Sequence, residues 1–129
     1  MSREIKFRAY HKERKEIFEI ASIDFEEKKV TLSNGIIKLL NVDFKQFELL
    51  QYTGLNDKNS KEIYENDLIS CNKHKNIVVF FEGGCFKVKY LRNSTTTITC
   101  TLNSFLEKYK CKISGNIYEN PELLEKNEW

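Results

Sequence analysis

The stretch Gln51-Tyr-Thr-Gly-Leu-Asn-Asp-Lys-Asn-Ser-Lys-Glu-Ile-Tyr-Glu-Asn-Asp-Leu-Ile69 determines how this chain folds, because it has the pattern of a strand, a tight turn and a second strand. The first apolar run ends at Thr53-Gly54. The residues Asp57-Lys58-Asn59-Ser60 have the composition of a turn. Apolar residues resume at Ile63-Tyr64 and again at Leu68-Ile69. The pattern therefore predicts a β-rich fold around this stretch.

The polar triplet Glu65-Asn66-Asp67 interrupts the second strand. A continuous strand would point these side chains alternately into the core. We therefore predict a turn with a positive φ at Asn66, a conformation that Gly and Asn adopt at the lowest cost. The apolar residues around the turn, Tyr64, Leu68 and Ile69, are expected to pack against Val79, Phe81 and Val88.

The residues before this stretch form β-hairpins by pattern. Arg3 to Tyr10 alternates apolar and polar side chains, with Ile5, Phe7 and Ala9 on one face, which is typical of a half-buried strand. A charged turn, His11 to Lys15, leads to a second strand at 16–20. Further short strands are expected at 23–25, 29–32 and 36–40, with an Asn34-Gly35 turn before the last.

The residues after it form a strand-rich unit with one helix. Ile77 to Phe81 is β-branched and aromatic, which favours a strand buried on both faces. Cys85 to Tyr90 alternates and predicts another strand. Apolar side chains at helical spacing from Leu102 to Tyr109 predict a helix over about 102–109, with Thr101 as its cap. A returning strand is expected at 111–114 and a last helical turn from Pro121.

The chain of 129 residues has the length of one domain, or of two small subdomains that share a core. We place a boundary within 41–47 and expect an N-terminal β-hairpin subdomain, 1–46, packed on a C-terminal subdomain, 47–129, as one compact unit. The predicted fold class is mainly β with a minor helical part. A chain of this length buries enough surface to fold without a metal or a disulfide.

The sequence predicts a cytoplasmic protein. Its longest apolar run, 77–81, is far too short to cross a bilayer, and its first residues lack the apolar core of a signal peptide. The four cysteines, Cys71, Cys85, Cys100 and Cys111, contain no C-x-x-C pair. We interpret them as buried free thiols and expect no structural metal and no cofactor.

Charge is distributed unevenly along the chain. The net charge is +2, whereas residues 70–112 contain eight basic and two acidic side chains. A basic half is typical of proteins that bind nucleic acid or an acidic protein surface. Aromatic residues, Phe86, Tyr90 and Tyr109, lie among these cations, a combination that can stack bases and neutralise phosphates. The same pattern is typical of a β core with a lysine-covered exterior. The candidate binding residues are Lys73, Lys75, Lys87, Lys89, Arg92, Lys108 and Lys110.

Three motifs together resemble a known family. They are Ile5-Lys-Phe-Arg-Ala-Tyr10, the segment 51–69 quoted above, and Gly115-Asn-Ile-Tyr-Glu-Asn-Pro-Glu-Leu-Leu124. In this order and spacing the chain resembles the YopX protein family of bacteriophages and prophages, over nearly its whole length. The chain departs from the family pattern at Tyr10-His11, at Ser60, where the pattern favours Gly, and at Asn66, where it also favours Gly.

The resemblance implies a mainly β fold whose second part is an SH3-like small barrel, and a phage or prophage source. It implies no catalytic residues. The motif residues that we expect to be structural are Thr53, Gly54, Asp57, Tyr64, Glu65, Asn66, Asp67, Gly115 and Asn116.

Two sets of residues have the chemistry of a catalytic site but also fit structural roles. Asp57, Glu65 and Asp67 could hold a divalent cation in a metal-dependent nuclease. Aspartates in turns more often accept hydrogen bonds from nearby backbone N–H groups, and we favour that role. His11 and His74 lie in charged segments, and we expect both to be solvated loop residues rather than general bases.

The sequence therefore favours a small phage accessory protein that is not an enzyme. We expect it to bind a host or phage protein, with antagonism of a host defence nuclease as one version of that role. Direct nucleic-acid binding through residues 70–112 is the alternative, and a metal-dependent nuclease is the second alternative. No membrane partner is expected.

Overall fold

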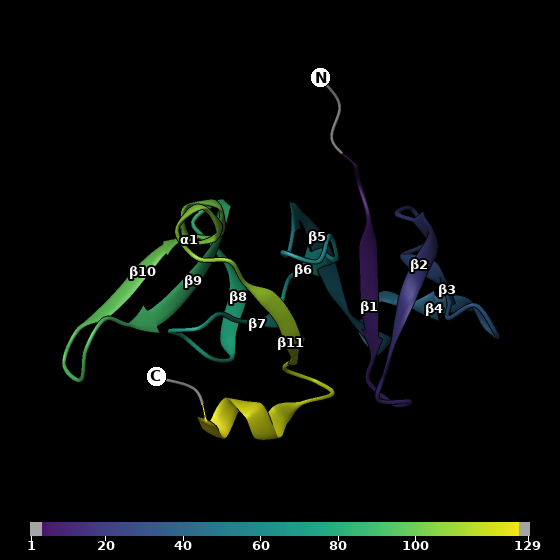
Figure 1. The fold of residues 1–129 in the computed structure, drawn as a ribbon. Coiled ribbons are helices and arrows are strands. Elements are labelled where there is room, and N and C mark those ends of the chain that lie inside the picture. Colours follow the sequence, from purple (N-terminus) through teal and green to yellow (C-terminus); the bar gives the residue numbers. More distant parts are fainter. Residues whose placement is uncertain (1–3, 127–129) are drawn as a thin grey trace. The chain divides into compact units, whose positions relative to one another are not determined.

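The computed structural model describes residues 4–126, and its elements are labelled in Figure 1. The chain divides into two compact units between Tyr52 and Thr53. This division falls inside the long strand β5 (Phe47–Asn56), while the predicted boundary lies where that strand begins. The predicted fold class is confirmed, since the chain is mainly β, with two antiparallel sheets and one short α-helix. No helix among the described residues is long and apolar enough to cross a membrane.

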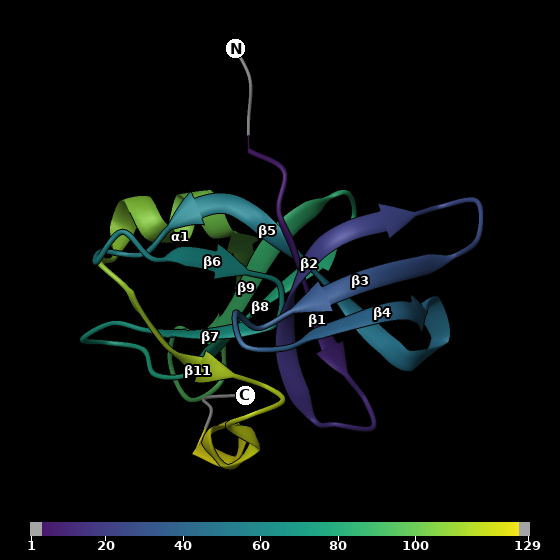
Figure 2. The same ribbon diagram turned by 90° about the vertical axis from the view of Figure 1, so that its right-hand side faces the viewer.

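The first unit is an antiparallel sheet in which β2, β3 and β4 lie side by side (Figure 2). Its strands are in the order β4-β3-β2-β1-β5. A short 3₁₀ helix, η1, precedes β5 and is capped by Asp43, whose carboxylate accepts a hydrogen bond from the N–H of Lys45. The bounds are β1 Phe7–His11, β2 Glu16–Asp24, β3 Lys29–Ser33, β4 Lys38–Asp43 and η1 Phe44–Gln46.

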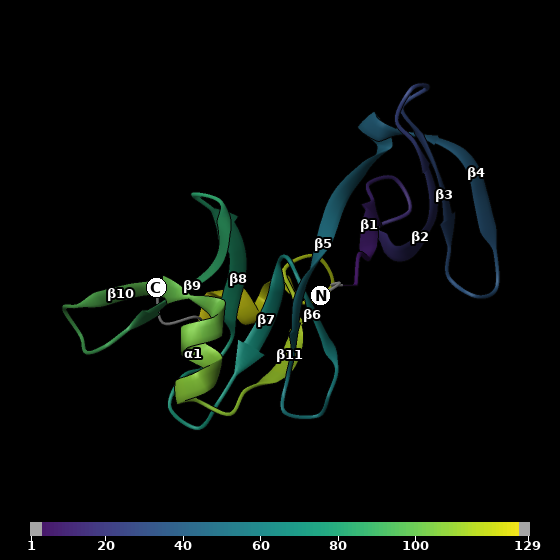
Figure 3. The same ribbon diagram turned by 90° about the horizontal axis from the view of Figure 1, so that it is seen from above.

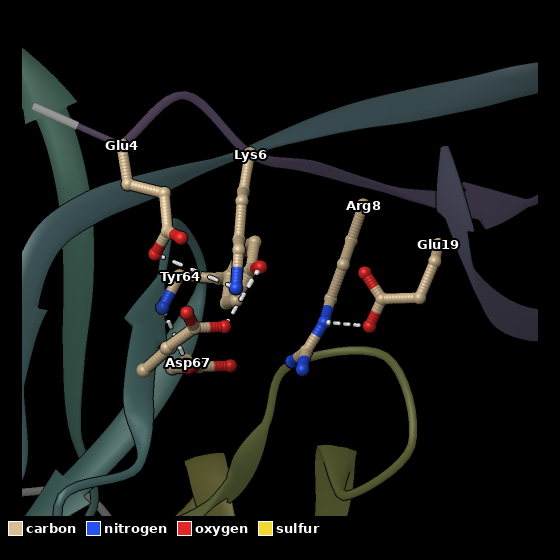
Figure 4. Close-up of polar contacts among 7 residues, drawn as sticks. Glu4, Lys6, Arg8, Glu19, Tyr64 and Asp67 are labelled. Carbon is tan, nitrogen blue, oxygen red and sulfur yellow. Dashed lines mark hydrogen bonds and ion pairs between the residues drawn. The ribbon is translucent and has the colours of Figure 1, made fainter. Parts of the chain in front are cut away.

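The core of the first unit follows from the alternation of its strands. Ala9, Phe18 and Leu32 are buried together with neighbours from β4 and β5. Within the sheet, Arg8 donates from Nε to Glu19, its partner across β1 and β2, at 2.9 Å (Figure 4). Ile5, predicted to face the core, is 75% exposed because β1 begins two residues later; Arg3 lies outside the described residues.

The structure places His11 differently from the prediction. It was expected in a solvated turn, but it is the last residue of β1 and is buried. Its Nδ1 accepts a hydrogen bond from the N–H of Arg14 at 3.1 Å, and its ring meets the edge of Phe18. The strand therefore continues one residue further than the charge pattern indicated, and the inward alternation places the imidazole in the core.

The second unit contains a five-stranded antiparallel sheet in the order β10-β9-β8-β7-β11. The helix α1 lies against β9 and β10, as Figure 3 shows from above. Thr101 caps α1 as predicted, because its side chain accepts a hydrogen bond from the N–H of Ser104. The unit is antiparallel β with one short α-helix, in agreement with the mainly β fold class that was predicted. The bounds are β6 Glu62–Tyr64, β7 Asp67–Ser70, β8 Ile77–Glu82, β9 Cys85–Leu91, β10 Thr97–Thr101, α1 Leu102–Lys108, β11 Lys112–Asn116 and η2 Pro121–Lys126.

The core of this unit contains most of the residues that were predicted to be buried. Tyr64, Leu68 and Ile69 are almost fully buried, and Val79 and Val88 are fully buried. Phe81 is the exception, since half of its surface is exposed. Strand β8 is therefore not buried on both faces: Ile77 and Val79 face the core, whereas Phe81 lies at the exposed end of the strand.

The predicted turn at Asn66 is present, with a φ of 69°. The N–H of Asn66 donates to the carbonyl of Val79 at 2.8 Å, and its own carbonyl accepts from Ile117 at 3.1 Å. Its side chain donates to the hydroxyl of Tyr118 at 2.9 Å. Ser60, which stands where the family pattern favours Gly, also has a positive φ, of 63°, so the first turn keeps a left-handed residue.

Replacing Asn66 tests this conformation. Asn66→Val should lower the free energy of unfolding by about 1–3 kcal/mol, because a β-branched residue is strained at a positive φ. Asn66→Gly should lie much closer to wild type, since it relieves the backbone but loses the hydrogen bond to Tyr118. Tyr118→Phe, which removes the hydroxyl that accepts this bond, should cost about 1 kcal/mol. Thermal melts measure all three, and a valine variant as stable as wild type would contradict the turn.

Two truncations in the second unit test which side chains belong to its core. Ile69→Ala should cost about 2–5 kcal/mol, because it leaves a cavity among fully buried neighbours. Phe81→Ala should cost less than about 1 kcal/mol, since half of that side chain already contacts water. Urea unfolding gives both values. Equal losses would show that Phe81 is a core residue after all.

Candidate functional site

A basic pocket of about 820 Å³ lies in the second unit. The loop between β7 and β8, the end of β9, the β9–β10 loop, strand β10 and the end of α1 form its walls. Three of its residues are among the predicted binding cations. The lining consists of Lys73, His74, Tyr90, Leu91, Arg92, Asn93, Ser94, Ile98, Lys108 and Tyr109.

The charge of the pocket has one sign. Lys73, Arg92 and Lys108 come from three different elements and are all exposed. None of the described residues that line the pocket is acidic. The ammonium group of Lys108 lies 5.5 Å from the ring centre of Tyr109, so the ring helps to hold this cation in place. Such a lining favours a ligand that carries negative charge.

The floor of the pocket is an aromatic cluster that includes His74. The ring centre of His74 is 4.6 Å from that of Tyr90 and 5.2 Å from that of Tyr109. Phe105 lies behind, 5.1 Å from Tyr90 and 4.9 Å from Tyr109. The interpretation of His74 as a solvated loop residue is therefore wrong, because the side chain is buried. Its sequence neighbours Lys73 and Lys75 are charged and exposed, so no local pattern indicated that the ring between them is buried.

Hydrogen bonds to the side chain of Asn93 hold the loop that carries Arg92. The side-chain oxygen of Asn93 accepts hydrogen bonds from the N–H groups of Thr95, at 2.9 Å, and Thr96, at 3.0 Å. The N–H of Arg92 donates to the carbonyl of Thr96 at 2.8 Å. The pattern Asn93-Ser94-Thr95 thus serves as a turn that positions Arg92 at the rim of the pocket.

Two weakly acidic groups at the pocket, Tyr90 and Cys100, stay uncharged at neutral pH. Burial raises the pKa of the Tyr90 phenol, with a further contribution from Cys100. Burial also raises the pKa of the Cys100 thiol, although nearby Lys108 acts in the opposite direction. Neither group adds negative charge, so the three cations determine the potential inside the pocket.

The other predicted binding cations lie outside the pocket. Lys87 and Lys89 are on the face of β9 opposite Val88 and Tyr90, as the alternation predicted, and Lys87 pairs with Glu82 at 3.7 Å. Lys75 and Lys110 are exposed. The structure therefore gathers three of the seven candidates and disperses four. No sequence pattern indicated Leu91, Ser94 or Ile98 as part of a site, because only the hairpin geometry brings them to it.

The cysteines are free thiols within the second unit. Cys71 and Cys111 are buried, and Cys85 and Cys100 are partly buried. Burial, together with the adjacent Cys71, raises the pKa of Cys111 to about 12, which keeps it a thiol. Among residues 4–126, no group of three or more His, Cys, Asp and Glu side chains is placed to hold a metal ion.

The acidic residues of the motif have the turn-capping contacts that the sequence favoured. One oxygen of Asp57 accepts from the N–H groups of Asn59 and Lys61, and the other accepts from Ile113 at 3.0 Å. Asp67 accepts from the N–H of Tyr64 at 2.8 Å (Figure 4). Glu65, the third residue of the suggested metal site, is half-buried.

The remaining motif residues also have structural contacts. The hydroxyl of Thr53 donates to the carbonyl of Ile63 at 2.8 Å, next to Gly54 with its positive φ. Gly115 sits at a bulge in β11, where a Cβ would overlap the side chain of Asn120. The side-chain oxygen of Asn116 accepts from the N–H groups of Tyr118 and Glu119. These contacts of the motif residues hold the turns and strands of the second unit together.

Asp57 gives a pH-dependent prediction. Burial opposes ionisation of this carboxyl, but the N–H groups of Ile113, Lys61 and Asn59 outweigh it and lower the pKa below 3.8. A carboxyl whose pKa is lower in the folded state stabilises the fold above its unfolded pKa of about 3.9, and this contribution is lost as the pH falls further. Asp57→Asn should therefore cost about 2 kcal/mol or more at pH 7, because an amide nitrogen then faces an N–H donor.

The difference between wild type and Asp57→Asn should narrow as the pH falls below about 4. Thermal melts across this range measure it. Asp24→Asn is the matched control, since Asp24 also accepts from two backbone N–H groups but is exposed in the first unit. A constant difference at every pH would contradict the assigned role of the Asp57 carboxylate.

Comparisons with known proteins agree with this fold. The chain is similar to protein EF1440 from Enterococcus faecalis, a crystal structure with 24% sequence identity and a TM-score of 0.60, over 95% of this chain and 99% of that chain. No curated protein matches the sequence. The family model described as "YopX protein" matches residues 6–125, nearly the whole length. The match covers both units, and the chain belongs to the YopX family.

Proposed function

We propose that this protein acts by binding, and that its partner is a host or phage protein that presents a negatively charged surface. The observation that supports this most is the placement of Lys73, Arg92 and Lys108 around one pocket without an acidic residue in its lining. Opposite charges across an interface steer the encounter and fix its register. This role needs no catalytic group, and the proposal is for a binding protein rather than an enzyme.

The setting that we propose is the cytoplasm of a bacterial host cell during phage or prophage gene expression. Four free thiols suit a reducing compartment. One partner of suitable chemistry is a host defence nuclease. Nucleases that use divalent cations gather carboxylates in their active sites, and a cationic pocket complements such a cluster. Antagonism of that nuclease would then follow from occupation of its acidic site.

Nucleic acid is the second candidate ligand, because aromatic rings and cations occur together in the pocket. Base stacking requires a ring face that is open to the ligand. Tyr90 is buried, and the ring of Tyr109 contacts His74, Phe105 and the ammonium of Lys108. The rings therefore support the pocket more than they offer a stacking surface, and this favours the protein partner.

A charge-reversal variant tests the proposed function. Wild-type protein should retain a stoichiometric partner from host lysate. The double variant Arg92→Glu and Lys108→Glu should weaken that interaction at least about tenfold, equivalent to about 1.4 kcal/mol. Lys112→Glu is the matched control, since it makes the same change at an exposed site on β11 of the same sheet. All of these residues are exposed, so melts of the variants should match wild type.

Two outcomes would contradict the protein-binding proposal. One is a partner that the double variant retains as well as wild type does. The other is the absence of any partner together with gel shifts on single- or double-stranded nucleic acid. In that second case the affinity should fall steeply with salt, because phosphate contacts release counterions, and the double variant should flatten this dependence.

A further inference from the structure

The outer strands of the sheet in the second unit are β10 and β11. An outer strand leaves alternate backbone N–H and C=O groups without a partner on its free side, and another extended chain can pair with them. Natural proteins usually protect such edges with bulges, charged residues or proline. The two edges of this sheet differ sharply in that respect.

Strand β11 carries the usual protection. Its register with β7 shifts between Ile113 and Gly115, so its edge is bulged. It begins with an exposed lysine, Lys112. The outer strand of the first unit, β4, is protected in the same way, by a register shift against β3, a left-handed residue at Asn41 and charged ends at Lys38 and Asp43.

Strand β10 carries none of these devices. Its sequence, Thr97-Ile-Thr-Cys-Thr101, has no charge, no proline and no glycine. It pairs with β9 in continuous register from Thr97, opposite Leu91, to Thr101, opposite Lys87. Among residues 4–126, no strand pairs with its other side. The β9–β10 hairpin extends to the left edge of Figure 1. Regular pairing over its whole length leaves an edge of the kind that accepts an added strand.

The basic residues around this edge favour a partner with negative charge. Ile98 lines the basic pocket, so β10 forms part of its wall. Arg92 lies in the loop that leads into β10, and Lys108 lies at the end of the helix that follows it. Thr99 is paired with Lys89 on the neighbouring strand. A chain that lies along β10 is therefore flanked by cations on several sides, and acidic side chains complement them.

We propose that β10 is a docking edge on which an extended, acidic segment of a partner protein pairs as an additional strand of the sheet. This inference rests on the proposed function and specifies how the partner binds. The backbone of the segment bonds to β10, and its acidic side chains reach Arg92 and Lys108. Backbone pairing provides affinity, and the pocket selects for charge.

Amide hydrogen exchange followed by NMR tests the proposal. The probe is a synthetic peptide that alternates aspartate and valine. In the free protein, every second amide of residues 97–101 should exchange rapidly, because only alternate N–H groups bond to β9. With the peptide at about ten times its Kd, the rapidly exchanging amides should slow by about tenfold. The amides of β11 should not change, since that edge is bulged.

Two control peptides separate charge from strand pairing. A peptide that alternates lysine and valine should bind far more weakly, because the flanking groups are cations. An aspartate–valine peptide that is N-methylated at every residue should lose the exchange protection, because it cannot donate a backbone hydrogen bond along either edge. The double variant Arg92→Glu and Lys108→Glu should lose binding of the aspartate–valine peptide, and Lys112→Glu should keep it.

Different results would contradict the docking edge on β10 and the proposed binding function. If the acidic peptide binds and shifts the signals of Arg92 and Lys108 while the β10 amides stay rapid, the docking edge is wrong and the basic pocket stands. If the peptide does not bind at low salt, the docking edge is also wrong. The proposed function itself falls only if the double variant retains the captured partner as well as wild type does, or if no partner is captured and nucleic acid shows gel shifts instead.

Discussion

The turn at Asn66 is the constraint on which the second unit depends. Its backbone N–H bonds to Val79, its carbonyl accepts from Ile117, and its side chain bonds to Tyr118. One left-handed residue therefore connects β8 to the segment that follows β11, on either side of β7. A residue with a negative φ at this point would turn the N–H and carbonyl of residue 66 away from Val79 and Ile117. The pairing register of β7 would then change, and its apolar side chains would no longer face the core. The polar triplet between the apolar pairs therefore forms the turn that joins β6 to β7.

Asp57 extends the same logic over a longer distance along the chain. Its carboxylate caps its own turn and also accepts the N–H of Ile113, which is 56 positions away in sequence. A buried carboxylate that accepts from three backbone N–H groups is held in its charged form and stabilises the fold. The most recognisable residues of the chain are thus structural, and the features suited to binding lie elsewhere, on the hairpin and helix that surround the basic pocket.

The pocket and the edge of β10 form one surface because the chain passes from the Arg92 loop through β10 into α1. The loop before the strand places an arginine at the pocket, and the helix after the strand places a lysine there. A cluster of rings beneath them, including His74 and Tyr90, fixes the positions of the supporting elements. Where packing already orders the backbone that carries the cations, an acidic partner binds with less loss of backbone conformational entropy.

The sequence alone determined the fold class, the helix after Thr101 and the left-handed turn at Asn66, because these follow from local periodicity, capping and backbone sterics. It also identified the family. Tertiary structure decided which cations share a pocket and which side chains lie inside. Lys73 and Lys108 line the same pocket only because the tertiary structure brings their elements together. His74 is buried because rings from distant parts of the chain enclose it, although its sequence neighbours are charged. Contacts between residues far apart in the chain leave no periodic signal, so local patterns could not reveal them.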